Sequence, residues 1–522
     1  MKQFLLFISI IGLISLASCR KDFSTQPSTG QLEFSKDTVF LDTIFSEIGS
    51  STYTLKVYNR SNEAITIPTI SLKDGENSRY RLNVDGIAGN SFNDIDILAK
   101  DSIFVFVEVT VSDLSTTELL YVDELLFDTG DKQQDVKLVT LVRDAVFLFP
   151  NKIDGVVETL LMGINDEEEE IRIEGRFLNE NHPINGNEYI FTNEKPYVIY
   201  GYMKVGSEDD QPKTLTVEAG AEIHFHANSG LLVGNGSSLH VMGTQNIEGQ
   251  ENTEVVFQGD RLEPAFENIS GQWGYIRFLT GSVNNYINYA TIKNGLIGLV
   301  SGGIQFVEVP TLEITNSQIY NNSLFGILGL HTNIKGRNLA LNNSGNSAFA
   351  AMVGGVYNFT HCTFANSINQ RSTPNVWLLD SNIVLKGEDD ELETRNFYSV
   401  NFTNCIIDGY SNMELGFDQQ GTDTEFNMHF ANNLIQFNDT QNTFEGEALY
   451  NFDDTNLYTN NIFNGFLDYK NLSLNELNIG ENSDAIGKAS FNGTLQAPID
   501  ILGKTRANPA DVGSYEHVIF EE

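Results

Sequence analysis

Short runs of alternating apolar and polar residues, separated by Asn, Gly and Ser, fill the second half of the chain. One such unit is 311-TLEITNSQIYNN-322, and comparable units recur at intervals of roughly two dozen residues. The long gap between Phe364 and Ile407 would hold a further unit if Ile383 is counted as its anchor. The apolar anchors of the units are Ile292, Ile319, Leu341, Phe364, Ile407, Ile435 and Ile462.

This alternation is that of β-strands and shows no helical period. Because one short unit cannot bury its apolar face alone, neighbouring units must stack. Stacking as parallel strands about 4.8 Å apart would bring the anchors into an interior ladder, in which we expect Ile319, Ile407, Ile435 and Ile462. Asn at the corners fits this arrangement, since Asn tolerates left-handed backbone. The alternative is a β-sandwich with irregular hairpins.

A tighter repeat precedes these units. The segment 215-LTVEAGAEIHF-225 matches 231-LLVGNGSSLHV-241 at an offset of 16 residues, with turns at Gly220 and Gly236. Further rungs are expected at 255–257 and 276–278. These motifs, together with 271-GQWGYIRF-278, resemble the opening coils of the right-handed parallel β-helix (pectate-lyase-like) superfamily.

The C-terminal segment carries a second resemblance. Its motifs 483-SDAIGKA-489, 500-DILGKTR-506 and 511-DVGSYE-516 resemble the tail that closes many bacterial surface β-helices. The two resemblances cover about residues 190–518 and imply a β-helix over 196–482, closed by 483–522. They imply no activity, because β-helices include lyases, hydrolases, adhesins and scaffolds.

Residues 1–18 are predicted to be a targeting signal, with Lys2 ahead of an apolar run too short to span a membrane. The following 16-LASC-19 resembles a bacterial lipobox, which implies cleavage before Cys19 and its acylation. The charged residues 20–22 resemble the post-cysteine segment of Bacteroidota surface lipoproteins. We therefore expect a lipid-anchored outer-membrane protein, on either the cell surface or the periplasmic face of that membrane, with the cell surface favoured. The alternative is an ordinary secretory signal with an incidental Cys.

Residues 19–31 are expected to form a flexible tether, and 32–145 an antiparallel sandwich of about seven strands. The segments 52–67 and 103–111 resemble immunoglobulin-like modules of bacterial surface proteins. Residues 146–195 are expected to connect the sandwich to the β-helix and cap it. Three sites resemble the O-glycosylation acceptor of Bacteroidota: Thr38, Thr43 and Ser102. The predicted strands are 38–41, 52–58, 65–70, 103–111, 124–127 and 136–142.

The charge balance limits the classes of partner that the chain can bind. With 31 basic and 70 acidic residues, the formal charge is −39. Nucleic acid is excluded as a partner, because its phosphates need a basic face. The acidic run 166–170 is expected to be a solvated loop, with a calcium site as the alternative.

Two groups of side chains are candidate chemical sites. His224, His226 and His240 are predicted on one outer face, His240 one rung above His224, where they could hold zinc or copper. The alternative, which we favour, is that these histidines fill solvent-facing positions where many polar residues would serve, and that they bind no metal. Cys362 and Cys405 are predicted two rungs apart, about 9.6 Å, beyond disulfide reach and buried as thiols.

Catalytic signatures are missing from the sequence. The motifs GHG and RIK of β-helix hydrolases are absent, and the pair 389–390 is expected in an exposed loop. Lys335, Arg337 and Lys386 are too sparse to nominate a base. We therefore expect no catalytic residue and no cofactor.

The favoured hypothesis is a non-catalytic binding, adhesion or scaffold protein, with glycans or other outer-membrane proteins as partners and its binding residues unspecified. The alternative is an extracellular polysaccharide lyase or glycoside hydrolase. An enzyme would need two carboxylates, or a Lys/Arg pair, on adjacent rungs of one groove.

Overall fold

The chain is all-β and contains two large parallel sheets. The computed structural model describes residues 24–112, 120–164, 169–209, 211–247, 249, 252–302, 309–369, 371–385 and 391–520. Cys19, Lys386, the pair 389–390 and residues 166–168 of the acidic run lie outside this part. Across the described residues, no helix has the length and apolar character needed to cross a membrane. The chain divides into two compact units, 1–144 and 145–522.

Unit 1 (residues 1–144) packs two sheets around one apolar core. Alternation sets the core: in β9, Ile103, Val105, Val107 and Val109 are buried while the residues between them face outward. The six-stranded sheet contains β1 (Gln26–Pro27), β3 (Thr38–Phe45), β5 (Ile65–Leu72), β8 (Ser91–Ile97), β10 (Leu120–Phe127) and β11 (Gln134–Arg143). The five-stranded sheet contains β2 (Glu33–Phe34), β4 (Tyr53–Tyr58), β6 (Tyr80–Val84), β7 (Ile87–Gly89) and β9 (Ser102–Val109).

All six strands predicted in this region exist, but β2, β6, β7 and β8 were missed, and the pairing is not wholly antiparallel. Strand β3 runs parallel to β11, and β1 parallel to β5. The described part of the predicted tether is also ordered. Gln26 and Pro27 pair with β5, and the hydroxyl of Ser28 donates to Asp128 at 2.7 Å. The polar composition of this segment suggested flexibility, but composition does not show which backbone groups pair.

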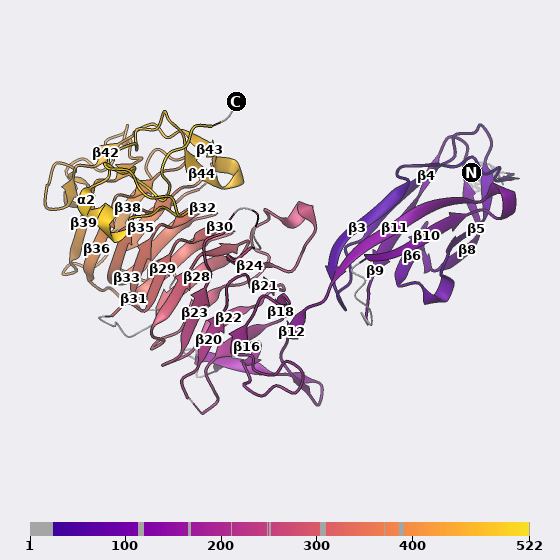
Figure 1. The fold of residues 1–522 in the computed structure, drawn as a ribbon, viewed down its shortest axis with the longest axis horizontal. Coiled ribbons are helices and arrows are strands. Elements are labelled where there is room, and N and C mark those ends of the chain that lie inside the picture. Colours follow the sequence, from indigo (N-terminus) through magenta and orange to yellow (C-terminus); the bar gives the residue numbers. More distant parts are fainter. Residues whose placement is uncertain are drawn as a thin grey trace, which may run out of the picture. The chain divides into compact units, whose positions relative to one another are not determined.

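In unit 2 (residues 145–522) the chain winds repeatedly through two parallel sheets, and its successive turns stack in chain order (Figure 1). A typical turn gives one strand to the 11-stranded sheet and two to the 18-stranded sheet; β21, β22 and β23 make one, and β24, β25 and β26 the next. Winding begins at Val146, which pairs with Tyr197. Parts of the expected connecting and capping segment 146–195 therefore already pair with the stacked turns, namely 146–148, 175–177 and 190–191.

The 11-stranded sheet contains β12 (Val146–Leu148), β18 (Tyr197–Ile199), β21 (Glu222–Phe225), β24 (Val255–Gly259), β27 (Ala290–Lys293), β30 (Gln318–Asn322), β32 (Ala340–Ser344), β34 (Thr363–Phe364), β37 (Ile406–Ile407), β40 (Leu434–Ile435) and β42 (Ile462–Phe463). The first part of the 18-stranded sheet contains β15 (Thr159–Ile164), β16 (Glu170–Phe177), β17 (Ile190–Phe191), β19 (Tyr202–Val205), β20 (Thr214–Val217), β22 (Gly230–Val233), β23 (Ser238–Met242), β25 (Ile276–Phe278) and β26 (Asn285–Asn288). The second part contains β28 (Ile297–Gly302), β29 (Leu312–Thr315), β31 (Phe325–Arg337), β33 (Ser347–Thr360), β35 (Val376–Leu379), β36 (Phe397–Thr403), β38 (Leu415–Asp418), β39 (Phe426–Ala431) and β41 (Tyr458–Thr459).

The predicted interior ladder exists along the 11-stranded sheet, with one error in its last rung. Ile435 pairs with Phe463, whereas Ile462 pairs with Leu434 and packs on the outer side. Both residues of β42 are apolar, so alternation could not set the register. The paired and buried rungs are Ile292, Ile319, Leu341, Phe364, Ile407 and Ile435.

Two other register predictions were wrong. Phe364 pairs directly with Ile407, and Ile383 is 39% exposed, so the long gap is one turn carrying an insertion. The 16-residue offset relates strands two apart in chain order, β20 to β22 and β21 to β23, and not strands stacked on one another, since Leu215 pairs with Leu239 while Leu231 pairs with Met203. Similar strands joined by similar glycine turns produced that match.

The C-terminal segment 469–520, which includes the described part of the predicted tail, packs along the outer side of the 11-stranded sheet. It contains β43 (Tyr469–Asn471), β44 (Glu476–Ile479) and α2 (Phe491–Gln496). The amide of Gly513 donates to the carbonyl of Asn404 at 2.9 Å, and the amide of Ser514 to the hydroxyl of Thr363 at 3.0 Å. Val512 packs on Ile406 of the 11-stranded sheet. The outer face of the 11-stranded sheet carries apolar side chains such as Ile406 and Leu434, and the C-terminal segment buries them.

Candidate ligand-binding pocket

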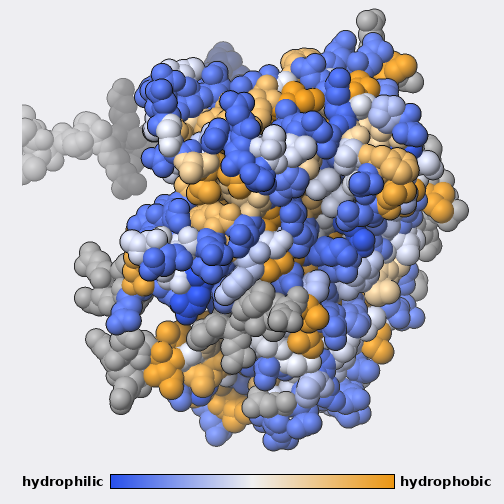
Figure 2. Space-filling model, turned by 90° about the vertical axis from the view of Figure 1, so that its left-hand side faces the viewer, coloured by the Kyte–Doolittle hydropathy of each residue, from blue (hydrophilic) through white to orange (hydrophobic). Residues whose placement is uncertain are grey.

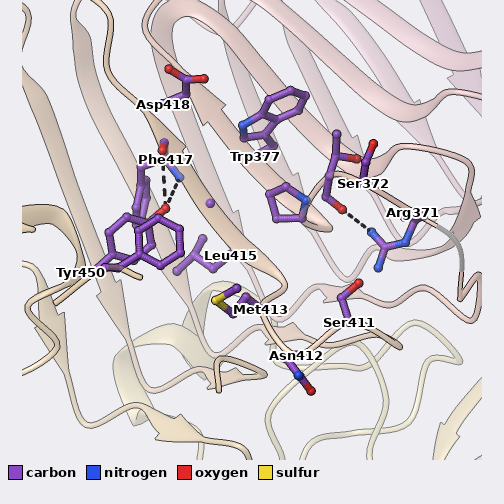
Figure 3. A pocket seen from close by; sticks show the side chains of 14 residues that line it. Arg371, Ser372, Trp377, Ser411, Asn412, Met413, Leu415, Phe417, Asp418 and Tyr450 are labelled. Carbon is purple, nitrogen blue, oxygen red and sulfur yellow. Dashed lines mark hydrogen bonds between the residues drawn. The ribbon is translucent and has the colours of Figure 1, made fainter. Parts of the chain in front are cut away.

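A cavity of about 600 Å³ opens beside β35 and β38. This volume lies within the range of roughly 300–1,000 Å³ found for small-molecule sites. Trp377 stands on one side of it, and Phe417 with Tyr450 on another, with Leu415 and Met413 between them (Figure 3). Polar side chains also contribute to the lining: Ser372, Thr373, Ser411, Asn412 and Asp418.

Gly416 shapes the floor of this cavity. It pairs with Trp377 across the two neighbouring strands. A Cβ at Gly416 would stand 2.5 Å from Cγ of Pro374, which is closer than such contacts allow. The absence of a side chain therefore lets Pro374 pack against the strand beside Trp377.

A buried ion pair lies at one side of the cavity, next to Pro374 and Gly416. Arg371 donates twice to Glu414, at 2.7 Å to each carboxylate oxygen, and both side chains are 0% exposed. The remaining guanidinium bonds go to the carbonyls of Asn346 at 3.2 Å, Thr373 at 3.1 Å and Ile368 at 3.4 Å. This pairing ties the insertion that carries Arg371 to the next turn of the chain.

The carboxylate of Glu414 also organises the rim. It accepts the amides of Ser411 at 2.7 Å and Asn375 at 3.1 Å. Burial raises the pKa of Glu414, and the Arg371 charge opposes that rise. Burial likewise raises the pKa of Asp408 to about 6, and the neighbouring Glu414 charge adds to the effect.

The aromatic side of the cavity is held rigidly. The hydroxyl of Tyr450 accepts the amide of Phe417 at 2.8 Å. The Phe444 ring stacks on Tyr450 with centroids 4.1 Å apart, and the Phe417 ring meets it edge-on at 5.0 Å. Burial raises the pKa of Tyr450 to about 12, so this hydroxyl stays neutral. A preformed apolar wall of this kind costs little to order on binding.

The three histidines do not form a metal site. His224 belongs to the 11-stranded sheet and pairs with Gln258, whereas His240 belongs to the 18-stranded sheet and pairs with Tyr286. The ring of His226 bonds the carboxylate of Asp260 at 2.7 Å. The stacking prediction failed because it relied on the 16-residue offset. In the described ranges, no group of three or more His, Cys, Asp or Glu could hold a metal ion.

Lys335 and Arg337 do meet a carboxylate. Both point outward from β31, where Arg337 donates to Glu313 of β29 at 2.6 Å and Lys335 lies 3.7 Å from the same oxygen. This group belongs to an outward row of polar residues, and the face of unit 2 seen in Figure 2 is mostly hydrophilic. The row contains Thr216, His240, Tyr286, Glu313, Lys335, Asn358, Asn401 and His429.

Sequence reasoning missed the cavity, because its lining comes from three separate turns. The usable signal was Trp377, one of two Trp in the chain, placed in the long gap between Phe364 and Ile407. The buried pair of Arg371 and Glu414 carried no local signal.

Comparisons with known proteins give little beyond this geometry. No protein-family model matches the chain, and no curated protein matches it. Among solved structures, the chain is similar to the catalytic unit of a thermostable GH87 α-1,3-glucanase from Streptomyces thermodiastaticus strain HF3-3, with a TM-score of 0.23 and 11% identity over 73% of this chain and 62% of that one.

Two further similarities are weaker. A family 123 glycoside hydrolase from Clostridium perfringens gives a TM-score of 0.16 and 11% identity over 22% of this chain and 24% of that one. A protein of unknown function from Porphyromonas gingivalis W83 gives 0.16 and 13% over 25% and 61%. The chain spans less than two thirds of each of these three structures, and likenesses at these TM-scores assign no activity.

Proposed function

We propose that this chain is a non-catalytic glycan-binding lipoprotein, held at the outer membrane by acylation of Cys19. In this proposal, unit 1 is an immunoglobulin-like stalk, and unit 2 is a right-handed parallel β-helix that presents the pocket at the cell surface. The stacked parallel turns support the β-helix, and the lipobox resemblance of 16-LASC-19 supports the anchor.

The observation that carries the binding proposal is the aromatic pocket with its polar rim. The apolar face of a sugar ring stacks on an aromatic side chain such as Trp377, while its hydroxyls bond rim groups such as Asn412 and Asp418. Among the residues that line the cavity, Arg371 and Asp418 are charged, and Glu414 already balances Arg371. An uncharged sugar therefore suits the site better than a uronate.

The same geometry supports a binding role over hydrolysis. Glycoside hydrolysis generally needs two carboxyl groups about 5–9.5 Å apart that both reach the sugar. Asp418 lines the cavity, but the carboxylate of Glu414 is buried and already accepts bonds from Arg371, Ser411 and Asn375. It has no free position from which to act as acid or base.

The alternative of a polysaccharide lyase or hydrolase is favoured by one observation, the meeting of Lys335 and Arg337 with Glu313. A Lys/Arg pair on one strand beside a carboxylate on the next partly meets the requirement for a catalytic cluster. The shared ion pairing with Glu313 weighs against a free base there.

A glycan panel separates the two functions. Purified protein is screened for binding to neutral oligosaccharides and to uronate polymers, and each mixture is assayed for new reducing ends and for unsaturated product by ultraviolet absorbance. Binding of a neutral glycan without product is expected. Product that disappears in Glu313→Gln would replace the proposal with the enzyme alternative.

A further inference from the structure

Cys362 and Cys405 stand on adjacent turns of unit 2, which corrects the predicted separation of two rungs. Cys362 immediately precedes β34 and Cys405 precedes β37, and these strands are paired with Thr363 opposite Ile406. Both thiols are unbonded in this structure and are 0% exposed. The distance argument against a bond between them therefore no longer applies.

The local geometry brings the two sulfur atoms toward one another. Residues that face each other on neighbouring parallel strands have Cα atoms about 4.8 Å apart, inside the range of roughly 4.4–6.8 Å that disulfides span. Sγ of Cys405 lies 3.5 Å from the amide nitrogen of Cys362, so this sulfur leans over the neighbouring turn. Both cysteines follow a residue with positive φ, His361 and Asn404, and so occupy the same corner of successive turns.

We propose that Cys362 and Cys405 are joined by a disulfide bond when the chain folds outside the cytoplasm. The export that supplies an oxidising compartment rests on the proposed function. In the reaction the two thiols lose two protons and two electrons and form one sulfur–sulfur bond. The electrons pass to the disulfide of a thiol–disulfide oxidoreductase or of an oxidised low-molecular-weight thiol, which is reduced to two thiols.

The bond forms before the stack closes. Burial raises the pKa of the Cys405 thiol well above its ordinary value, which suppresses the thiolate that attacks a disulfide. With both sulfur atoms buried, an external oxidant reaches them only in the unfolded or partly folded chain. Protein folded under reducing conditions should therefore keep both thiols for as long as it stays folded.

The loop that this bond closes carries part of the binding pocket. Arg371, Pro374 and Trp377 all lie between the two cysteines. Closing a long loop restricts the unfolded chain and so stabilises the folded one. The disulfide would therefore clamp the base of the insertion that supplies the Trp377 side of the cavity.

The test uses the full chain with Cys19→Ser, which leaves Cys362 and Cys405 as its only thiols. Unfolded protein is refolded with reduced and oxidised glutathione, and a second sample with reductant alone. Each sample is then denatured in the presence of a thiol-alkylating reagent. The expected product of oxidative refolding carries no alkyl group and has a mass about 2 Da below that of the chain with two free thiols. Its digest should contain a cross-linked peptide with both cysteines. The oxidised protein should also melt several degrees above the reduced sample.

The double variant Cys362→Ser, Cys405→Ser is the matched control and should melt at the same temperature in both buffers. Two alkylated thiols, or two mixed disulfides with glutathione, in a chain with native circular dichroism would overturn the proposal. So would an internal disulfide in a chain that has lost that native spectrum, because the bond would then be incompatible with the stacked turns. None of these outcomes depends on whether the pocket binds a glycan or Cys19 is acylated.

Discussion

Replacing Arg371 by Met would leave the carboxylate of Glu414 buried without a counter-ion. The variant loses the two 2.7 Å bonds between the side chains, while Glu414 keeps the amides of Ser411 and Asn375. Breaking a fully buried pair in this way costs about 3–5 kcal/mol. We expect a loss of that size in the free energy of unfolding of unit 2 at neutral pH.

The size of the loss should depend on pH. Burial already raises the pKa of Glu414 in the presence of Arg371, and removal of the cation raises it further. A carboxyl whose pKa is raised in the folded state adds stability at low pH and loses it as the pH rises through that value. The cost of Arg371→Met should therefore shrink at mildly acidic pH, where Glu414 binds a proton and becomes neutral.

Urea unfolding followed by tryptophan fluorescence measures this loss, since both Trp residues, Trp273 and Trp377, lie in unit 2. The matched control is Lys470→Met, which breaks a 2.6 Å pair with Glu476 whose side chains are 51% and 40% exposed. An exposed pair contributes about 0–1 kcal/mol. A loss below about 1 kcal/mol for Arg371→Met, or a loss that does not change with pH, would refute the argument from burial.

Three further predictions test other parts of the molecule. Asp408→Asn removes a carboxyl whose pKa rises from 3.8 to about 6 on folding, so chemical denaturation should find the variant more stable than the parent above about pH 6, by up to about 3 kcal/mol, and no more stable below pH 3.8. Ile319→Asp places a charge in the interior ladder and should cost more than about 4 kcal/mol, whereas Ile462→Asp on the outer side should cost about half as much; equal urea midpoints would contradict the register. Cys19→Ala should move the protein from the membrane fraction to the soluble fraction on cell fractionation, and undiminished retention would argue against the lipid anchor.

Much of the winding could be predicted because alternation reports which side of a strand is buried. Ile319 and Ile407 were placed correctly on that basis. The argument failed where both sides are covered: Ile462 and Phe463 are both apolar because the C-terminal tail packs outside the last rungs. Counting Ile383 as a rung had a larger effect, since it separated Cys362 from Cys405.

The pocket depends on features that have no sequence period. Its ion pair joins Arg371 to Glu414 across successive turns, and the register that brings them together is set by the ladder, not by either residue. The sequence alone does not show why a glycine is needed at position 416; the structure shows that Pro374 packs where its Cβ would stand. Trp377 was the available signal, because it is one of two tryptophans in the chain and falls in the long gap between two anchors of the ladder.

Binding to the aromatic pocket is tested most directly by calorimetric titration of the tightest neutral oligosaccharide from the panel into the parent protein, Trp377→Ala and the matched control Phe491→Ala. Phe491 is 62% exposed on α2 and lies outside the lining of the pocket. The account predicts that Trp377→Ala weakens the affinity about tenfold or more, as expected for loss of roughly 1.4 kcal/mol or more of stacking, and that Phe491→Ala leaves it unchanged. Equal affinities for all three proteins would contradict the assignment of the pocket.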